Sequence, residues 1–325
     1  MTIPPIENST MPRLLSLAVL FIASLPAFSA DPVTHRVLGS DRTTGKMAII
    51  ATDGTVEWEF TNKHDVHDLH LLPNGNYLTH IRHTIVAEIS PKKEIVWQYE
   101  SKPKDGYTGR VEVHAFQRLA DGNTMIAEGG NSRIIEVDPK GKIVTEVALN
   151  LPKSDAHRDT RMVRKLASGN YLVCHEGIGT VREYDASGQT VWEYKLDLAG
   201  RPRSPGHGVE GHGTEVFGAV RLANGNTLIA GGNNNRVIEV NNAGKVVWSV
   251  DQKELPGITL AWVTTLQVLP NGNVIIGNCH AGPTNPQLIE VTREKKVVWT
   301  FKDFKTFGDS LAAALVLDIK GDVIR

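Results

Sequence analysis

Acidic and basic side chains recur at fixed distances before three glycines of the chain, and their types are suited to chemistry. An acidic residue stands ten positions before each glycine, and a histidine or an arginine stands eight positions before it. The pairs are Asp65 and His67 before Gly75, Glu112 and His114 before Gly122, and Asp159 and Arg161 before Gly169. Imidazole and carboxylate groups that converge from different strands can hold a transition-metal ion. The same groups could instead do acid/base or nucleophilic work on a substrate anchored by Arg158 or Arg161.

The two offsets differ by two residues, so in extended strands these side chains would point the same way. We hypothesise a pocket lined by all six, with His67 and His114 as the candidate metal ligands. A third interpretation is a polar surface of water and salt-bridged pairs, because such clusters also occur in purely structural networks. The residue types leave metal binding, metal-free catalysis and simple binding open.

The glycines belong to a repeat that must position these side chains. A glycine in an Asn-Gly-Asn-like turn recurs with a period of about 47 residues, and a tryptophan closes most units in the same phase. The glycines are Gly75, Gly122, Gly169, Gly225, Gly272 and Gly321, and the tryptophans are Trp58, Trp97, Trp192, Trp248 and Trp299, with Thr145 in the third copy. Two anchors in phase indicate a repeat architecture.

Each unit alternates apolar and polar residues over short runs separated by turn residues, which is typical of strands. In the copy around Gly225 we predict strands at residues 215–222, 227–230, 236–240 and 245–250. Four-stranded antiparallel units of this length are blades of a β-propeller. We therefore predict an all-β chain in which residues 31–325 form one propeller domain.

The number of blades follows from counting units. Five units are complete, and a sixth can be assembled from the two ends of the chain. We expect residues 311–325 to supply its first two strands and residues 35–60 to supply the remaining ones. Six blades are predicted, with seven as the alternative. The recurring tryptophans are expected to pack between neighbouring blades, because each indole buries a large apolar area.

Two motifs resemble a known family. The stretch from Asp185 to Trp192 has the form Asp-x-x-Gly-x-x-x-Trp, and Leu-x-Asn-Gly-Asn turns recur, as in the quinoprotein (pyrroloquinoline quinone, PQQ)-like propellers. The run from His64 to Asn76 more narrowly resembles arylsulfotransferase-like propeller repeat proteins. The resemblance covers essentially the whole chain after residue 30. It implies a propeller and a histidine in a central funnel, but not bound PQQ, because the chain lacks the adjacent cysteines of the quinone dehydrogenases.

Ten of the twelve histidines fall on one predicted face. In a propeller, the blade-to-blade connections and the loops between second and third strands share a face. Six histidines lie in such connections or at the starts of first strands, and four lie at or near such loops. His175, His212 and His280 therefore join the six residues above as candidate ligand-binding residues. We expect binding to use this His-rich face at the mouth of the central channel.

The first thirty residues differ from the rest of the sequence. A short positive start at Arg13 precedes an apolar run from Leu14 to Leu25 and a small-residue site at residues 27–30, the pattern of a secretory signal peptide. Translation could start at Met1 or Met11. The apolar run is short for a membrane span, so we expect an exported protein, periplasmic or secreted, without a transmembrane span once the leader is removed.

Charge argues against a nucleic-acid partner. Lys and Arg total 35 against 36 Asp and Glu, and no basic stripe is present. We expect a monomer that binds a protein partner or a small molecule through its His-rich face. An enzyme on the same face, arylsulfotransferase-like or metal-assisted, is the alternative.

Overall fold

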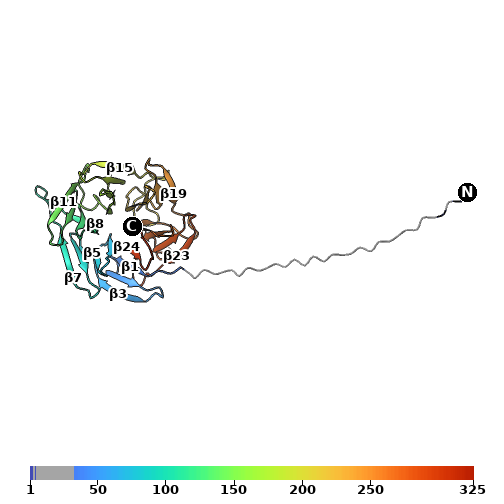
Figure 1. The fold of residues 1–325 in the computed structure, drawn as a ribbon, viewed down its shortest axis with the longest axis horizontal. Coiled ribbons are helices and arrows are strands. Elements are labelled where there is room, and N and C mark those ends of the chain that lie inside the picture. The colour runs from blue at the N-terminus through green and yellow to red at the C-terminus, as the bar shows by residue number, and fades with distance from the viewer. Residues whose placement is uncertain (3, 5–32) are drawn as a thin grey trace. The chain divides into compact units, whose positions relative to one another are not determined.

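The computed structural model describes residues 1, 2, 4 and 33–325, and every regular element in residues 33–325 is a β-strand. The predicted signal peptide lies outside the described residues, apart from Met1, Thr2 and Pro4. The strands form six four-stranded antiparallel sheets. Figure 1 shows these sheets as the blades of a propeller arranged around a centre. The predicted six-bladed fold is thus confirmed, and the seven-bladed alternative is wrong.

Blades 1 to 3 contain the first half of the described chain and, in blade 1, one strand from its C-terminal end. From the innermost to the outermost strand, blade 1 is β24 (Leu311–Val316), β1 (Val37–Asp41), β2 (Lys46–Ile50) and β3 (Val56–Thr61); blade 2 is β4 (Leu69–Leu71), β5 (Tyr77–Arg82), β6 (Ile85–Ile89) and β7 (Ile95–Glu100); blade 3 is β8 (Glu112–Arg118), β9 (Thr124–Gly129), β10 (Arg133–Val137) and β11 (Ile143–Ala148).

Blades 4 to 6 repeat the same order. Blade 4 is β12 (Val163–Lys165), β13 (Tyr171–His175), β14 (Thr180–Tyr184) and β15 (Thr190–Lys195); blade 5 is β16 (Gly218–Arg221), β17 (Thr227–Ala230), β18 (Val237–Val240) and β19 (Val246–Val250); blade 6 is β20 (Trp262–Val268), β21 (Val274–Cys279), β22 (Leu288–Val291) and β23 (Val297–Phe301). Within the described residues, no helix has the length and apolar character of a membrane span.

In blades 2 to 6, the recurring glycine closes the turn between the first and second strands. The amide of Gly75 donates to the carbonyl of Leu72 at 2.9 Å, and Gly225 makes the same bond to Leu222. Both glycines have a positive φ, 82° and 86°. That backbone region is disfavoured for residues with a Cβ atom, which explains why glycine recurs there.

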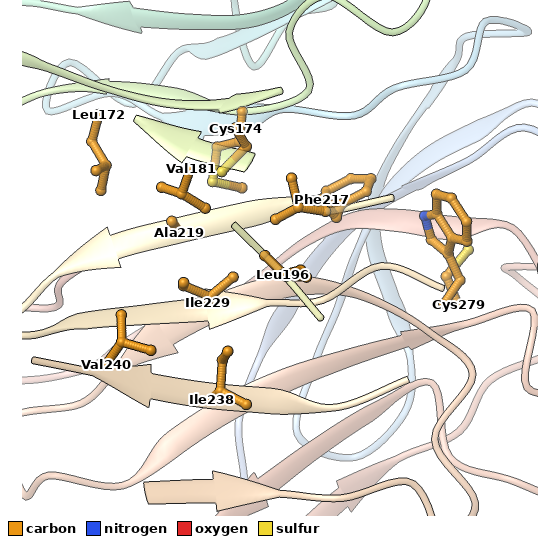
Figure 2. Packing of buried hydrophobic residues seen from close by; sticks show 13 residues of the cluster. Leu172, Cys174, Val181, Leu196, Phe217, Ala219, Ile229, Ile238, Val240 and Cys279 are labelled. Carbon is orange, nitrogen blue, oxygen red and sulfur yellow. The ribbon is translucent and has the colours of Figure 1, made fainter. Parts of the chain in front are cut away.

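The hydrophobic core lies between blades. Strands two and three of each blade are almost wholly buried, because both of their faces pack against neighbouring blades. Figure 2 shows one such layer, where Leu172 and Val181 of blade 4 face Ala219 and Ile229 of blade 5. The outermost strands alternate between exposed and half-buried residues. Each interface therefore stabilises two blades at once.

The tryptophans pack between blades, as predicted. The indole of Trp97 donates to the carbonyl of Pro139 in the next blade at 3.1 Å, and Arg118 lies over its ring at 5.0 Å. Trp248 donates to Arg293 in the same way, at 2.7 Å. These contacts confirm a structural role for the indoles.

The closing blade differs from the prediction. The C-terminal segment supplies only β24, and the N-terminal segment supplies the three strands outside it. After β24 the amide of Leu317 still donates to Arg36, but Ile324 then pairs with Val268 of blade 6 instead of forming a second strand of blade 1. The expected contribution of two strands from residues 311–325 is therefore wrong, because the buried β1 already occupies the second place.

Candidate functional site at the channel mouth

The innermost strands of blades 2, 3 and 4 bring three predicted residues together. His67 precedes β4, His114 lies in β8, and Arg161 precedes β12. They occupy equivalent positions in consecutive blades, so their side chains converge at the end of the central channel where these strands begin. We call this region the channel mouth. The His67 and His114 rings lie 4.7 Å apart, centroid to centroid, and the Arg161 guanidinium is 3.1 Å from His67 Nε2.

A β-bulge places His114. In the pairing of β8 with β9, Val113 faces Glu128 and Ala115 faces Ala127, so His114 has no partner on the neighbouring strand. Bulges redirect a side chain and are frequent beside functional sites. The repeat pattern alone did not reveal this irregularity.

Glu112, His114 and His157 form a compact set, which we call the Glu112 cluster. Glu112 Oε2 lies 3.1 Å from His114 Nε2 and 2.8 Å from His157 Nδ1. One potential ligand atom from each residue falls within 4.8 Å of the other two. Glu112 and His114 are buried, whereas the His157 side chain is 45% exposed. The cluster is therefore accessible from the His157 side.

Arg161 links this cluster to the rest of the mouth. Its Nη2 lies 3.3 Å from His157 Nε2, and it makes a buried ion pair with Glu176. Arg158, about a third exposed, lies 3.4 Å from Glu176 Oε1 and 3.2 Å from Glu215. The mouth thus carries alternating positive and negative groups.

Burial keeps the inner histidines neutral. Burial, and then the positive charge of Arg161, lower the pKa of His114 to about 3. The same two causes lower the pKa of His67 well below its usual range. A neutral imidazole offers one lone pair and one proton, so it can accept, donate or ligate a metal.

The channel below the mouth is almost filled. The space under His67 measures about 20 Å³, room for about one water. Arg164 crosses it to bind both oxygens of Asp68, at 2.7 and 2.8 Å, and Arg325 lines the same space. This part of the channel therefore has no room for a ligand larger than about one water.

Two predicted acidic residues do not face the cluster. The Asp65 carboxylate accepts a bond from Arg42 at 2.7 Å. The Asp159 carboxylate accepts bonds from the amides of Gly130 and Asp155, both at 2.8 Å. Asp159 therefore organises the connection between blades 3 and 4.

Three predicted histidines also lie apart from it. His175 is buried, with Nδ1 2.6 Å from the carbonyl of Asp159 and Nε2 2.9 Å from the hydroxyl of Tyr184. His212 lines a separate pocket of about 570 Å³ with Arg201 and Arg236. His280 lies near His207, 5.6 Å between ring centroids. Of the nine predicted residues, the structure brings His67, Glu112, His114 and Arg161 together.

The offset comparison missed His157 and Glu176 as members of this site, whereas Arg158 is one of the two predicted substrate anchors. His157 lies in a connection between blades, where the repeat gives no aligned position, so the offsets could not identify it. Glu176 directly follows His175 at a loop between second and third strands. A search for charged residues in these loops could have found it.

Comparisons with known proteins bear on the fold. Residues 156–301 match the PQQ_2 family model, described as outer membrane protein assembly factor BamB. No curated protein matches the chain. A crystal structure of a protein of unknown function from Bacteroides caccae is 25% identical, covers 89% of this chain and 100% of its own, and superposes with a TM-score of 0.72.

Lyases share the fold at lower identity. Streptogramin B lyase is 13% identical over 83% of this chain and 80% of its own, with a TM-score of 0.56. An inactive virginiamycin B lyase from Staphylococcus aureus with quinupristin is 14% identical over 84% and 86%, with a TM-score of 0.54. These two likenesses concern the fold alone. Together, the family match and the solved structures support a PQQ-like β-propeller repeat, a fold suited to binding and scaffolding.

Proposed function

We propose that this chain is an exported binding module that recognises a small anionic ligand at the channel mouth. The observation that carries the proposal is the convergence of His67, His114, His157 and Arg161 on one mouth. Two further arginines lie beside these groups: the Arg158 side chain is 37% exposed and paired with Glu176 and Glu215, and the Arg110 side chain is 71% exposed and paired with Glu112. Guanidinium and imidazole N–H groups are suited to carboxylate, sulfate or phosphate groups.

Export is part of the same proposal. The sequence pattern of residues 11–30 supports a cleaved leader, and the description of the matching family refers to the outer membrane. The protein recovered outside the cytoplasm should begin near Ala30 or Asp31. Its intact mass would reveal retention of the leader, which would contradict export by cleavage.

An enzyme working from the same mouth is the second candidate. The favouring observation is a buried, neutral His114 beside the Glu112 carboxylate and near Arg161, since such groups suit acid/base chemistry. The arylsulfotransferase-like resemblance of residues 64–76 would place transfer of a sulfuryl group there. Replacing His67 and His114 together should abolish turnover. Circular dichroism would show whether the variant still folds, and loss of turnover in a folded variant would support a catalytic role for the two histidines.

The binding proposal can be tested with defined anions. Thermal unfolding of the chain from Asp31 onward would be followed with sulfate, phosphate and a series of aromatic carboxylates. We expect at least one probe to raise the melting temperature, because a ligand that binds only the folded state stabilises it. Arg158→Gln should weaken the apparent affinity for that probe roughly tenfold, because it removes one charge-assisted contact.

Lys142→Gln provides the control for overall charge. Lys142 is exposed in the turn between β10 and β11, on the opposite face. The control should respond to the anion like the parent. Equal weakening in both variants would indicate diffuse charge attraction, and no response to any probe would contradict a small anionic ligand and favour a protein partner.

A further inference from the structure

We propose that Glu112, His114 and His157 hold one divalent transition-metal ion, of which Zn²⁺ is the best fit, with a coordination position open to the channel mouth. The inference rests on the proposed function, because the ion would form part of the same ligand-binding mouth. It replaces the His67 and His114 pair with a different donor set. Two contacts of His114 carry it, and a third contact, between His157 and Arg161, shows what must change when the ion binds.

The first contact fixes the tautomer of His114. Its Nδ1 lies 3.1 Å from the carbonyl oxygen of Thr160, and only a protonated nitrogen can donate to that oxygen. The neutral ring therefore carries its proton on Nδ1 and a lone pair on Nε2.

The second contact is between the lone pair on His114 Nε2 and the Glu112 carboxylate. His114 Nε2 is buried without a hydrogen-bond partner, and its near neighbour is Glu112 Oε2 at 3.1 Å. Two electron-rich atoms at this distance repel each other unless a cation lies between them. A metal ion would give His114 Nε2 the partner that it lacks and would replace the hydrogen bond between His157 Nδ1 and Glu112 Oε2.

The third contact concerns His157 and Arg161. Guanidinium nitrogens only donate, so the 3.3 Å contact from Arg161 Nη2 makes His157 Nε2 an acceptor and leaves the ring proton on Nδ1. Coordination through Nδ1 would shift that proton to Nε2 and break the long contact with Arg161. The freed Arg161 N–H would then be available to an anionic ligand beside the metal.

The dimensions of the cluster fit this assignment. Donors around tetrahedral zinc lie roughly 3.3 Å apart, given bonds of about 2.0 to 2.1 Å. The observed separations from Glu112 Oε2 are 3.1 and 2.8 Å, so His157 must move outward by a few tenths of an ångström. Its partly exposed side chain has room to do so. Two histidines and one carboxylate leave an open position for water or ligand.

Surrounding bonds would hold the ligands in place. Thr160 fixes the His114 ring through Nδ1, and Arg110 binds the second oxygen of Glu112 at 2.8 Å. Such outer contacts orient metal ligands and tune their basicity. The positive Arg161 is neutralised by Glu176, which limits its repulsion of a cation.

The test is zinc binding by the untagged chain from Asp31 onward, stripped with a chelator and titrated with zinc chloride in equilibrium dialysis. Elemental mass spectrometry should find about one equivalent per chain at saturation, the stoichiometry of a single three-ligand site. His157→Gln should weaken zinc binding by roughly a hundredfold or more, since it removes a direct ligand. Because this side chain is partly exposed, the variant should fold, which circular dichroism would verify. Glu112→Gln should have the same effect if it folds.

His83→Gln is the matched control. His83 is exposed on the same face and has no atom in the Glu112 cluster. The control should bind zinc like the parent. Absence of binding in the parent would overturn the proposal, and so would equal losses in His83→Gln and His157→Gln, which would indicate diffuse binding by surface histidines.

The zinc experiment separates this inference from the proposed function. A protein that binds anionic probes without binding zinc would retain the proposed function and refute the metal site. A protein that binds zinc at the cluster but no anion would support the site and refute the anionic ligand. Tighter binding of the anion in the presence of zinc would support both, since linked sites share one coupling free energy.

Discussion

The two halves of the inner ring place opposite chemistry at the same structural position. Eight residues before the recurring glycine, blades 2, 3 and 4 carry His67, His114 and Arg161. The same position in blades 5, 6 and 1 carries Phe217, Thr264 and Ala313, all of them buried. All six blades have the same order of four strands, so the fold does not require polar residues at this position. We call these the polar half and the apolar half.

At these inner positions the polar half carries two imidazoles and a guanidinium, whereas the apolar half buries a phenylalanine, a threonine and an alanine. Every buried polar group must find a partner, because an unpaired one is expensive. Arg164 of blade 4 crosses the channel to Asp68 of blade 2, 96 residues away in sequence. In the apolar half, Ala219, Trp262 and Cys279 simply pack together. A sequence that keeps such costly groups on one side is consistent with a binding role there.

The largest expected difference between the halves is their response to acid. Burial lowers the pKa of His70, His80 and His175, all in the polar half, to about 4 each. Unfolding restores the ordinary value near 6.5, so between pH 6.5 and 4 the unfolded chain binds protons that the folded chain does not. Stability is therefore full above pH 6.5 and falls as the pH decreases. Each histidine contributes up to roughly 1.4 kcal/mol per pH unit, for a total of several kcal/mol.

Native-state hydrogen exchange can locate this loss. Protection factors at pH 7 and pH 5, corrected for intrinsic exchange, should fall more in blades 2 to 4 than in blades 5 and 6. The variant His175→Gln should reduce the fall around β13. Equal loss of protection in all blades would mean that the ring unfolds as one unit and would remove the energetic distinction between the halves.

The next largest effect concerns the buried ion pair between Asp68 and Arg164. Asp68→Asn should lower the free energy of unfolding by about 3 to 5 kcal/mol, because it leaves Arg164 buried without its counter-charge and close to Arg325. Urea unfolding would measure it. Thr265→Val is the matched change in the apolar half, since Thr265 occupies the same repeat position and accepts a bond from the Ala314 amide at 3.2 Å. Thr265→Val should lower the free energy of unfolding by about 1 kcal/mol. Similar costs for both variants would contradict the comparison.

Local periodicity predicted most of the fold. In blade 5, β17 spans Thr227–Ala230 as predicted, and β18 and β19 each start one residue later than expected. The inner strand β16 begins at Gly218 and not at residue 215, because the amide of Glu215 bonds to the Asn233 side chain instead of a neighbouring strand. Turn glycines and alternating apolar residues act over a few positions, so they are visible in sequence.

The site was only partly predictable because its contacts are not local. Repeat register identified His67, Glu112, His114 and Arg161 as neighbours. It could not show that the Asp159 carboxylate turns away to bind the Gly130 amide, or that a bulge redirects His114. The prediction of the closing blade was wrong for a similar reason, because the sequence does not show which end of the chain supplies its second strand. Pairing across blades depends on three-dimensional packing.

The smallest predicted effect tests whether the contrast is confined to the inner ring. Trp97 in the polar half and Trp248 in the apolar half each donate to a carbonyl of the next blade and lie under an arginine, at 5.0 and 4.4 Å. Trp97→Phe and Trp248→Phe should therefore each lower the free energy of unfolding by about 1 kcal/mol, the value of one hydrogen bond with the ring retained. Urea unfolding of both variants would measure the two losses. Costs that differ by more than about 1 kcal/mol would exceed the spread expected for such bonds and show that the asymmetry reaches the outer strands. Equal losses of unfolding free energy would restrict the asymmetry between the halves to the residues that face the channel, where the ligand is proposed to bind.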